Sequence, residues 1–230
     1  MSGDGNSFIM SYWGDQHSTK IQTGIVNAFS YNSATSVWDN VLTAIGDNVS
    51  AGRLGWSVHI SYNADFIAAI ASVKPSNSKF FRKVNGSYVE TSSESGFPTK
   101  TNANSVLVGT SISADGKCVA WVDNQDNQIE VYSYNASTAS WSQKGTGIVN
   151  NVPYQNGATE YTYLDTTGSK VVVIYKENIE TTPYALIKTY AYDGTNWNQL
   201  GSDISKNDWI AATNTPINVT TILSALPKPP

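Results

Sequence analysis

The chain has 230 residues, of which 40% are hydrophobic and 11% aromatic, so it is long enough to bury a sizeable core within one domain. Only 14% of the residues are charged and the net charge is −4, which argues against an electrostatic surface for nucleic acid or for an anionic membrane. The one cysteine, Cys118, excludes an intramolecular disulfide. The start of the chain shows no secretory signal, and no apolar run approaches the ~18 residues of a membrane span.

A unit of about fifty residues returns four times along the chain. Its first marker is the stretch Phe29–Trp38, which aligns with Tyr132–Trp141 without a gap. Tyr190–Trp197 repeats the stretch with two residues fewer, and Phe81–Tyr88 is a weaker copy. Repeats of this length made of strand-like pieces indicate a propeller or a solenoid, in which no unit buries its hydrophobic face alone.

The second marker of each unit is a tight turn. Its four copies are Ser2–Gly5, Ser61–Ala64, Ser113–Gly116 and Asp165–Gly168. Glycine at the last position suits a hairpin corner that needs a positive φ. Because alanine replaces this glycine in the second unit, we expect that turn to differ from the others.

Each unit consists of four short predicted strands, rich in β-branched and aromatic residues and separated by Asn, Asp, Gly and Ser. The sequence therefore predicts an all-β protein, a β-propeller of about four four-stranded blades in a single domain at 1–226. A proline-rich tail follows at 227–230. The predicted blades cover about 1–50 together with 217–224, then 55–92, 105–148 and 157–205.

The first predicted blade begins at its turn and lacks the strand that precedes this turn in the other units. The strand-like segment 217–224 has no unit of its own, so we expect it to supply that strand and close the ring. Closure would remove exposed sheet edges, which promote aggregation. Two alternatives stay open: the chain is a piece of a larger protein, or its last strand completes a neighbouring molecule.

The repeat resembles that of propeller-like proteins with the pattern W-x-Q-x-G-x-x-I, carried here by Trp141–Ile148 and Trp197–Ile204. In that family the pattern precedes an S-x-D-G hairpin and a short apolar strand, which Ser113–Val122 matches. In the first unit, Trp38 is not followed by the Gln of the pattern. In the second unit, Tyr88 replaces the Trp of the pattern, so the second blade is expected to be irregular. The resemblance implies a scaffold found on bacterial, eukaryotic and large-virus surface proteins, and it implies no single activity.

Residues for catalysis are sparse. The two histidines, His17 and His59, lie far apart in the repeat and lack neighbouring ligands at metal spacing. His59 is expected to be a packed or channel-lining residue. A glycosidase needs two converging carboxylates, and the predicted inner strands offer only Glu160, with Asp165 in a turn. The sequence therefore predicts no enzyme, no metal site and no cofactor.

The aromatic residues fall into two groups. One recurs once per unit and is expected to pack within or between blades: Trp38, Tyr88, Trp141 and Trp197. The other lies where each second strand ends and forms a predicted rim with nearby polar residues: Tyr12, Trp13, Asp123, Asn124, Tyr175 and Lys176. Such a rim suits a sugar face or a protein partner, and ordinary exposed strand ends are the third interpretation.

These observations predict a non-enzymatic binding or structural module that contacts a protein partner on a surface or particle. A lectin-like carbohydrate-binding propeller is the alternative, and a glycoside-processing enzyme is a more distant one. Neither nucleic acid nor membrane insertion is expected, and the oligomeric state is left open. A surface, extracellular or virion location is favoured over the cytoplasm.

Overall fold

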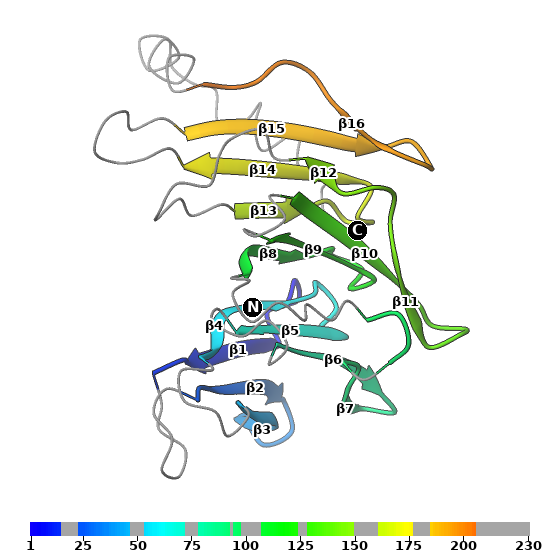
Figure 1. Cartoon of the computed structure of the whole chain (residues 1–230). Coiled ribbons are helices and arrows are strands. Elements are labelled where there is room, and N and C mark those ends of the chain that lie inside the picture. The colour runs from blue at the N-terminus through cyan, green and yellow to red at the C-terminus, as the bar shows by residue number, and fades with distance from the viewer. Residues whose placement is uncertain are drawn as a thin grey trace.

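The computed structural model describes residues 1–14, 23–46, 53–71, 78–92, 94–97, 107–123, 128–149, 161–176 and 185–205. All regular secondary structure within these ranges is β-strand. The strands form four antiparallel sheets that lie side by side in chain order (Figure 1). The predicted all-β class with repeated antiparallel sheets is therefore confirmed.

The sheets are numbered here from the N-terminus. Sheet 1 contains β1 (Ser7–Tyr12), β2 (Ile25–Asn32) and β3 (Val37–Ile45). Sheet 2 contains β4 (Leu54–Ile60), β5 (Phe66–Ala71), β6 (Lys79–Val84) and β7 (Ser87–Glu90). Sheet 3 contains β8 (Leu107–Ile112), β9 (Cys118–Asp123), β10 (Gln128–Asn135), β11 (Ser140–Gln143) and β12 (Ile148–Val149). Sheet 4 contains β13 (Tyr161–Leu164), β14 (Lys170–Lys176), β15 (Ala185–Tyr192) and β16 (Trp197–Gln199).

The sheets are joined to one another in series. Contacts run from sheet 1 to sheet 2, from sheet 2 to sheet 3 and from sheet 3 to sheet 4, while sheets 1 and 4 lie at opposite ends of the stack (Figure 1). Ring closure, which was expected from 217–224, falls outside the described residues, as does the tail at 227–230. The described part of the chain is thus an open arc of four sheets.

Hydrophobic side chains fill each of the three junctions between sheets. Sheets 1 and 2 enclose Val26, Ala28, Leu54, Ile67 and Phe81, among others. Sheets 2 and 3 enclose Phe66, Phe80, Val119, Trp121 and Trp141, among others. Sheets 3 and 4 enclose Val122, Ile129, Val131, Val173 and Tyr175, among others. Full burial of such a side chain contributes roughly 1.5–3 kcal/mol, so these junctions dominate the stability of the arc.

Alternation along the strands explains how one sheet serves two junctions. In β5 all six residues are buried, because one face packs on sheet 1 and the other on sheet 3. In β14, Val171 and Val173 face sheet 3, so the intervening Val172 points to the opposite face. A strand that is apolar on both faces therefore requires a neighbour on each side.

The S-x-D-G turns form the corners of the sheets. In sheet 3, Ser113 Oγ donates to Asp115 Oδ1 over 2.6 Å and accepts a hydrogen bond from the Cys118 N–H over 2.9 Å. Consecutive corners are linked by one backbone hydrogen bond each. The donor and acceptor pairs are Gly3 N with Tyr62 O at 2.7 Å, Tyr62 N with Ala114 O at 3.0 Å, and Asp115 N with Thr166 O at 3.0 Å. The repeated turn therefore also holds each sheet to the next.

The expectation that Ala64 alters its turn is wrong. Ala64 adopts a φ of 57°, close to the 73° of Gly116. Its N–H donates to the Ser61 carbonyl over 3.0 Å, as the Gly116 N–H does to the Ser113 carbonyl over 2.9 Å. The hydrogen bonds of the corner impose the left-handed conformation on a residue that disfavours it.

The repeat-marker aromatics face the preceding sheet. Trp141 is buried between sheets 2 and 3, and Trp197 donates its Nε1–H to the Lys144 carbonyl of sheet 3 over 2.6 Å. Tyr88 packs at the junction with sheet 1 and donates its hydroxyl to the Ala64 carbonyl over 2.6 Å. Trp38 differs, because it is 40% exposed on the face of sheet 1 that no described sheet covers.

The corner conformation predicts opposite effects for two substitutions. Ala64→Gly removes the strain of an alanine in the left-handed conformation, which costs the folded state about 1–2 kcal/mol. The substitution also makes the unfolded chain more flexible, which lowers stability by about 0.4–1 kcal/mol. The net effect should be a stabilisation of about 0.5–1 kcal/mol. Gly116→Ala should destabilise by at least about 1–2 kcal/mol, since its φ is 73° and an added Cβ would lie 2.9 Å from Phe66 Cβ. Urea unfolding measures both changes. A destabilised Ala64→Gly variant would contradict this explanation of the corner.

Candidate functional site

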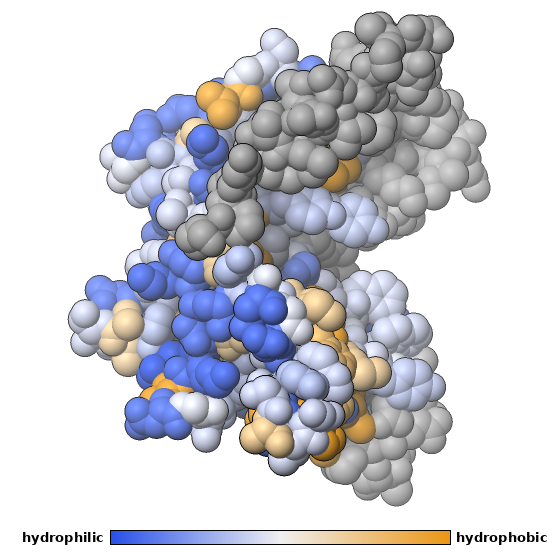
Figure 2. All heavy atoms as spheres, turned by 180° about the vertical axis from the view of Figure 1, so that it is seen from behind, coloured by the Kyte–Doolittle hydropathy of each residue, from blue (hydrophilic) through white to orange (hydrophobic). Residues whose placement is uncertain are grey.

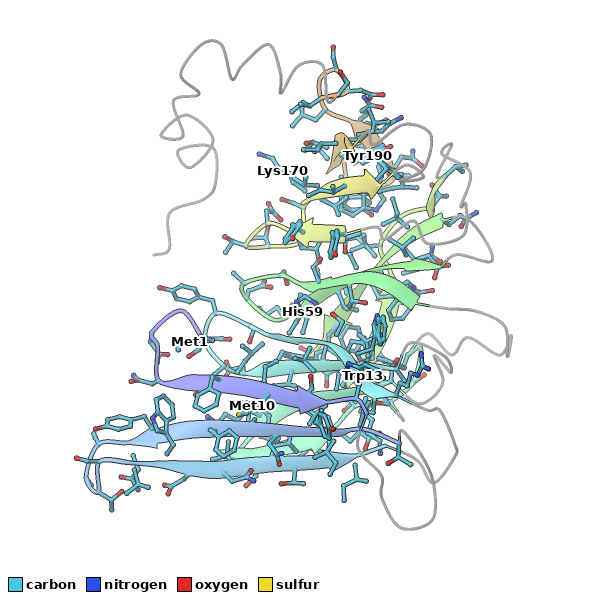
Figure 3. All side chains as sticks on the ribbon, turned by 90° about the vertical axis from the view of Figure 1, so that its left-hand side faces the viewer. Met1, Met10, Trp13, His59, Lys170 and Tyr190 are labelled. Atoms are coloured by element: carbon cyan, nitrogen blue, oxygen red, sulfur yellow. The ribbon has the colours of Figure 1, made fainter. Side chains whose placement is uncertain are left out.

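The predicted rim lies where β1, β9 and β14 end. Trp13 follows the end of β1, and Figure 3 shows it at the opposite end of sheet 1 from Met1. Tyr12, the last residue of β1, is 66% exposed. This end of the junction between sheets 1 and 2 carries a group of side chains that the sequence did not bring together.

Arg53 lies beside two exposed indole rings that contact each other. Its Cζ is 5.4 Å from the ring centroid of Trp13 and 6.0 Å from that of Trp56. The two indoles meet edge to face with their centroids 5.3 Å apart. Trp13 is 40% exposed and Trp56 is 48% exposed. We call Trp13, Arg53 and Trp56 the Trp–Arg cluster.

Local backbone features hold the Trp–Arg cluster at the surface. Arg53 has a φ of 52°, and its carbonyl accepts a hydrogen bond from the Trp56 N–H over 3.2 Å. The Leu54 N–H donates to the Thr23 carbonyl of the neighbouring sheet over 3.0 Å. A bulge between Leu54 and Ser57 turns this end of β4 out of register with β5. A positive φ in a residue that is not glycine is unfavourable, and these backbone contacts hold Arg53 in it.

Gly55 allows the two sheets to approach at this point. An added Cβ would lie 2.6 Å from the Cβ of Ser11 on β1 and 2.9 Å from a methyl group of Val26. The residue also has a φ of 86°. A larger residue would push sheet 2 away from sheet 1 and separate the two indoles.

The remaining rim residues do not join this cluster in the described structure. Tyr175 is 1% exposed in the core between sheets 3 and 4, so its proposed role in ligand binding is corrected to a packing role. Asp123 and Lys176 end β9 and β14, and their side chains lie outside the described structure. Asn124 is also outside the described residues.

Sequence reasoning missed Arg53 and Trp56 because neither belongs to the repeat. They lie about forty residues from Trp13, and only the contact between sheets brings them next to it. One signal was available, namely a non-recurrent Trp at the start of a predicted first strand. In a propeller that position borders the end of the second strand of the preceding blade.

His59 lies on β4, three residues beyond Trp56. Its Nε2 is 2.9 Å from Ser57 Oγ, and burial lowers the pKa of His59 to about 4 from its usual 6.5. The imidazole is therefore neutral at pH 7. A base with this pKa is poorly matched to proton transfer near neutrality, so we assign His59 no catalytic role.

Of the two carboxylates considered from the sequence, the structure describes only Asp165. Asp165 Oδ1 accepts hydrogen bonds from the Ser169 and Lys170 N–H groups over 2.7 and 3.1 Å, so it shapes its turn. Glu160 lies outside the described residues. Among the residues that the structure describes, no cluster of three or more His, Cys, Asp or Glu side chains could hold a metal ion. Within the same ranges, no helix is long and apolar enough to cross a membrane.

Neither a model of a known protein family nor a curated protein sequence matches the chain. Solved structures do resemble it. A protein from Bacteroides uniformis assigned as a 6-phosphogluconolactonase is 12% identical with a TM-score of 0.56, over 88% of this chain and 55% of that chain. The periplasmic gluconolactonase of Pseudomonas aeruginosa is 13% identical with a TM-score of 0.53, over 87% and 55%. Hsv2 from Kluyveromyces lactis is 11% identical with a TM-score of 0.52, over 85% and 58%.

These likenesses show a propeller-like fold, and the chain spans a little more than half the length of each of these three structures. They also correct the predicted function. A non-enzymatic interaction module was expected, whereas the structures that share the fold over most of the chain include lactonases, which are enzymes. The comparison lends no support to a structural or virion-surface role. At these identities the feature shared with the chain is the fold.

Burial of His59 predicts a pH-dependent stability. Between pH 6.5 and about 4 the unfolded chain binds a proton at this residue and the folded chain does not, so stability falls as the pH is lowered through this range. The loss should reach about 2–3 kcal/mol near pH 4. His59→Gln should remove this part of the dependence while carboxylate effects stay. Urea unfolding between pH 4 and 8 tests it, and parallel pH profiles for the two proteins would contradict it.

Proposed function

We propose that this chain processes sugar lactones and that the Trp–Arg cluster is its ligand site. The observation that carries the proposal is one guanidinium beside a pair of exposed, mutually contacting indoles at the edge of a sheet junction. An exposed aromatic pair around a charged donor has the composition of a ligand site, which combines apolar surface with a few placed polar groups.

The chemistry of the cluster suits an oxygen-rich ring with an acyl group. Indole faces provide flat apolar surface on which the C–H face of a sugar ring can rest. A guanidinium presents several N–H donors in a planar fork, which matches a carboxylate, a phosphate or a polarised carbonyl oxygen. A sugar lactone and its acid product carry both features. Arg53 would bind the acyl oxygens while Trp13 and Trp56 contact the ring.

Lactone hydrolysis gives Arg53 a defined role. Water adds to the ester carbonyl carbon, the bond from this carbon to the ring oxygen breaks, and the released alkoxide takes up a proton as the acid ionises. Negative charge develops on the carbonyl oxygen during the addition. A guanidinium beside that oxygen stabilises the charge, and one such donor is worth about 10²–10³ in kcat.

The comparisons support this proposal through the fold. One of the similar structures is a periplasmic gluconolactonase, and another has been assigned as a 6-phosphogluconolactonase. The periplasmic relative also supports a location outside the cytoplasm, which we propose for this chain. The chain spans only 55% of those two structures. Our proposal is therefore limited to what the Trp–Arg cluster itself can do, which is to bind the lactone and stabilise the charge on its carbonyl oxygen.

Hydrolysis of D-glucono-1,5-lactone, followed in a pH-stat against the spontaneous rate, tests the proposal. Wild type should accelerate the reaction, and Arg53→Gln should lower kcat/KM by about 10²-fold through loss of oxyanion stabilisation. Trp13→Ala should mainly raise KM, since it removes ring contact. Arg82→Gln is the matched control, because Arg82 pairs with Glu94 over 3.3 Å on sheet 2, outside the cluster.

Calorimetric titration with D-gluconate and 6-phosphogluconate separates binding from turnover. Binding that Arg53→Gln abolishes, without hydrolysis by wild type, would keep the site and reject the enzymatic role. Folded wild-type protein that neither binds these acids nor accelerates hydrolysis would overturn the proposal as a whole.

A further inference from the structure

The two end sheets of the arc each present an outward face. Figure 3 shows Met10 on sheet 1 and Lys170 on sheet 4 far apart in the stack. In the three internal junctions, the corresponding faces are packed against a neighbouring sheet. Each outward face therefore resembles one half of an internal junction, and no described sheet packs against it.

The outward face of sheet 1 is aromatic. Phe8 stacks on Phe29 with ring centroids 5.0 Å apart and meets Trp38 edge to face at 4.8 Å. Tyr31 also contacts Trp38, with ring centroids 5.3 Å apart. Met10 is 56% exposed and Trp38 is 40% exposed. Hydrophobic side chains gather in the lower half of the molecule in Figure 2, where Figure 1 places sheets 1 and 2.

Trp38 is the repeat marker of sheet 1, and its counterparts define what it would contact. Tyr88, Trp141 and Trp197 each pack against the sheet that precedes them. Trp38 faces the same way, but the described chain has no sheet before sheet 1. Trp38 is therefore exposed because no described sheet packs against it, whereas its counterparts are covered by the preceding sheet.

The outward face of sheet 4 carries the complementary half of a junction. Thr162 of β13 faces sheet 3, where its Oγ1 is 3.2 Å from Ser111 Oγ. The alternate residues Tyr161 and Tyr163 point away from sheet 3 and are 48% and 54% exposed. Tyr163 lies opposite Val172 in the pairing of β13 with β14, so the face continues as apolar surface across both strands.

Sheet 4 also contains the backbone segment that would bind a marker tryptophan from a following sheet. At the junction of sheets 3 and 4, an added Cβ on Gly145 would lie 3.2 Å from the ring of Trp197, whose Nε1–H donates to the Lys144 carbonyl. Leu200 and Gly201 are the matching residues of sheet 4. Gly201 has a φ of 78°, as Gly145 has 74°, and an added Cβ would meet nothing within 4 Å.

We propose that a second copy of this chain docks on the arc, with sheet 1 of each copy packed against sheet 4 of the other, so that two chains close one ring of eight sheets. In each new junction Trp38 sits over Gly201 and donates its Nε1–H to the Leu200 carbonyl. Two identical junctions satisfy both outward faces at once, and a closed ring leaves neither for further growth.

The backbone hydrogen bonds between corners support the same arrangement of the two copies. Each internal junction has a donor in the turn of one sheet and an acceptor in the turn of the next. The Asp115 N–H donates to the Thr166 carbonyl at the last internal junction. If the series continues, a backbone N–H in the turn of sheet 4 donates a hydrogen bond to the Gly3 carbonyl of the second copy. The proposed junction thus repeats the corner hydrogen bond of the three internal junctions and the tryptophan hydrogen bond of the junction between sheets 3 and 4.

The comparisons agree with a ring built from two arcs. The chain matches 55% of each lactonase chain, so one arc corresponds to slightly more than half of such a fold. Two arcs amount to about 110% of such a fold, so the proposed ring of eight sheets is slightly larger than the fold of those structures. Closure by 217–224 of the same chain is the competing outcome, since it would complete the ring with four sheets.

Sedimentation velocity of the full chain across 1–200 µM tests the proposal. Wild type should form a species of twice the 24.9 kDa chain mass and no larger one. Trp38→Glu and Tyr163→Glu should each weaken dimerisation by about 30-fold or more, as expected for a buried interface anchor. Trp56→Glu is the matched control at a Trp of similar exposure outside the end faces, and it should leave the dimer intact. Circular dichroism confirms that each variant is folded.

Mixing the two variants tests the head-to-tail arrangement. A chain with Trp38→Glu keeps a sound sheet 4, and a chain with Tyr163→Glu keeps a sound sheet 1, so the mixture should form one intact junction and more dimer than either variant alone. A monomer at 200 µM, a dimer that both substitutions leave unchanged, or open oligomers beyond the dimer would each overturn the proposal. A compact monomer would favour closure within one chain.

Discussion

The structure depends on one constraint: strands that are apolar on both faces must be covered on both sides. β5 shows it most directly, since all six of its residues are buried between sheets 1 and 3. No single sheet can meet this requirement, so each becomes stable only beside its neighbours. The corner hydrogen bonds and the marker aromatics then set the distance and orientation at every junction.

The same constraint creates the candidate site. Trp13 directly follows β1 of sheet 1, Arg53 directly precedes β4 of sheet 2 and Trp56 lies within β4. Only the junction therefore makes Trp13 a neighbour of the other two. The close approach that Gly55 permits brings the indoles into contact, and the bulge in β4 offsets this segment from the register of β5. The chemistry proposed for the chain is thus a property of an interface between repeats, where sequence is free to depart from the repeat without disturbing the core.

Sequence reasoning reached the fold class because its signals are local and periodic: the turn at Ser113–Gly116 and the aromatic at Trp141 each return at intervals of about fifty residues. It failed where a residue depends on a partner from another unit. Tyr175 was expected at the surface because it ends a strand, yet it packs against sheet 3. Ala64 was expected to change its corner, yet surrounding hydrogen bonds override the preference of one residue. Arg53 carries no local signal of its role.

The outward face of sheet 1 and the Trp–Arg cluster can be probed in one sample by hydroxyl-radical footprinting. Trp38 and Trp56 have similar exposure in the single chain, 40% and 48%, so they should react alike at low concentration. If unsatisfied sheet faces govern the assembly, raising the concentration should protect Trp38 and leave Trp56 reactive. Equal reactivity of the two residues at every concentration would contradict the view that the end sheets need a partner.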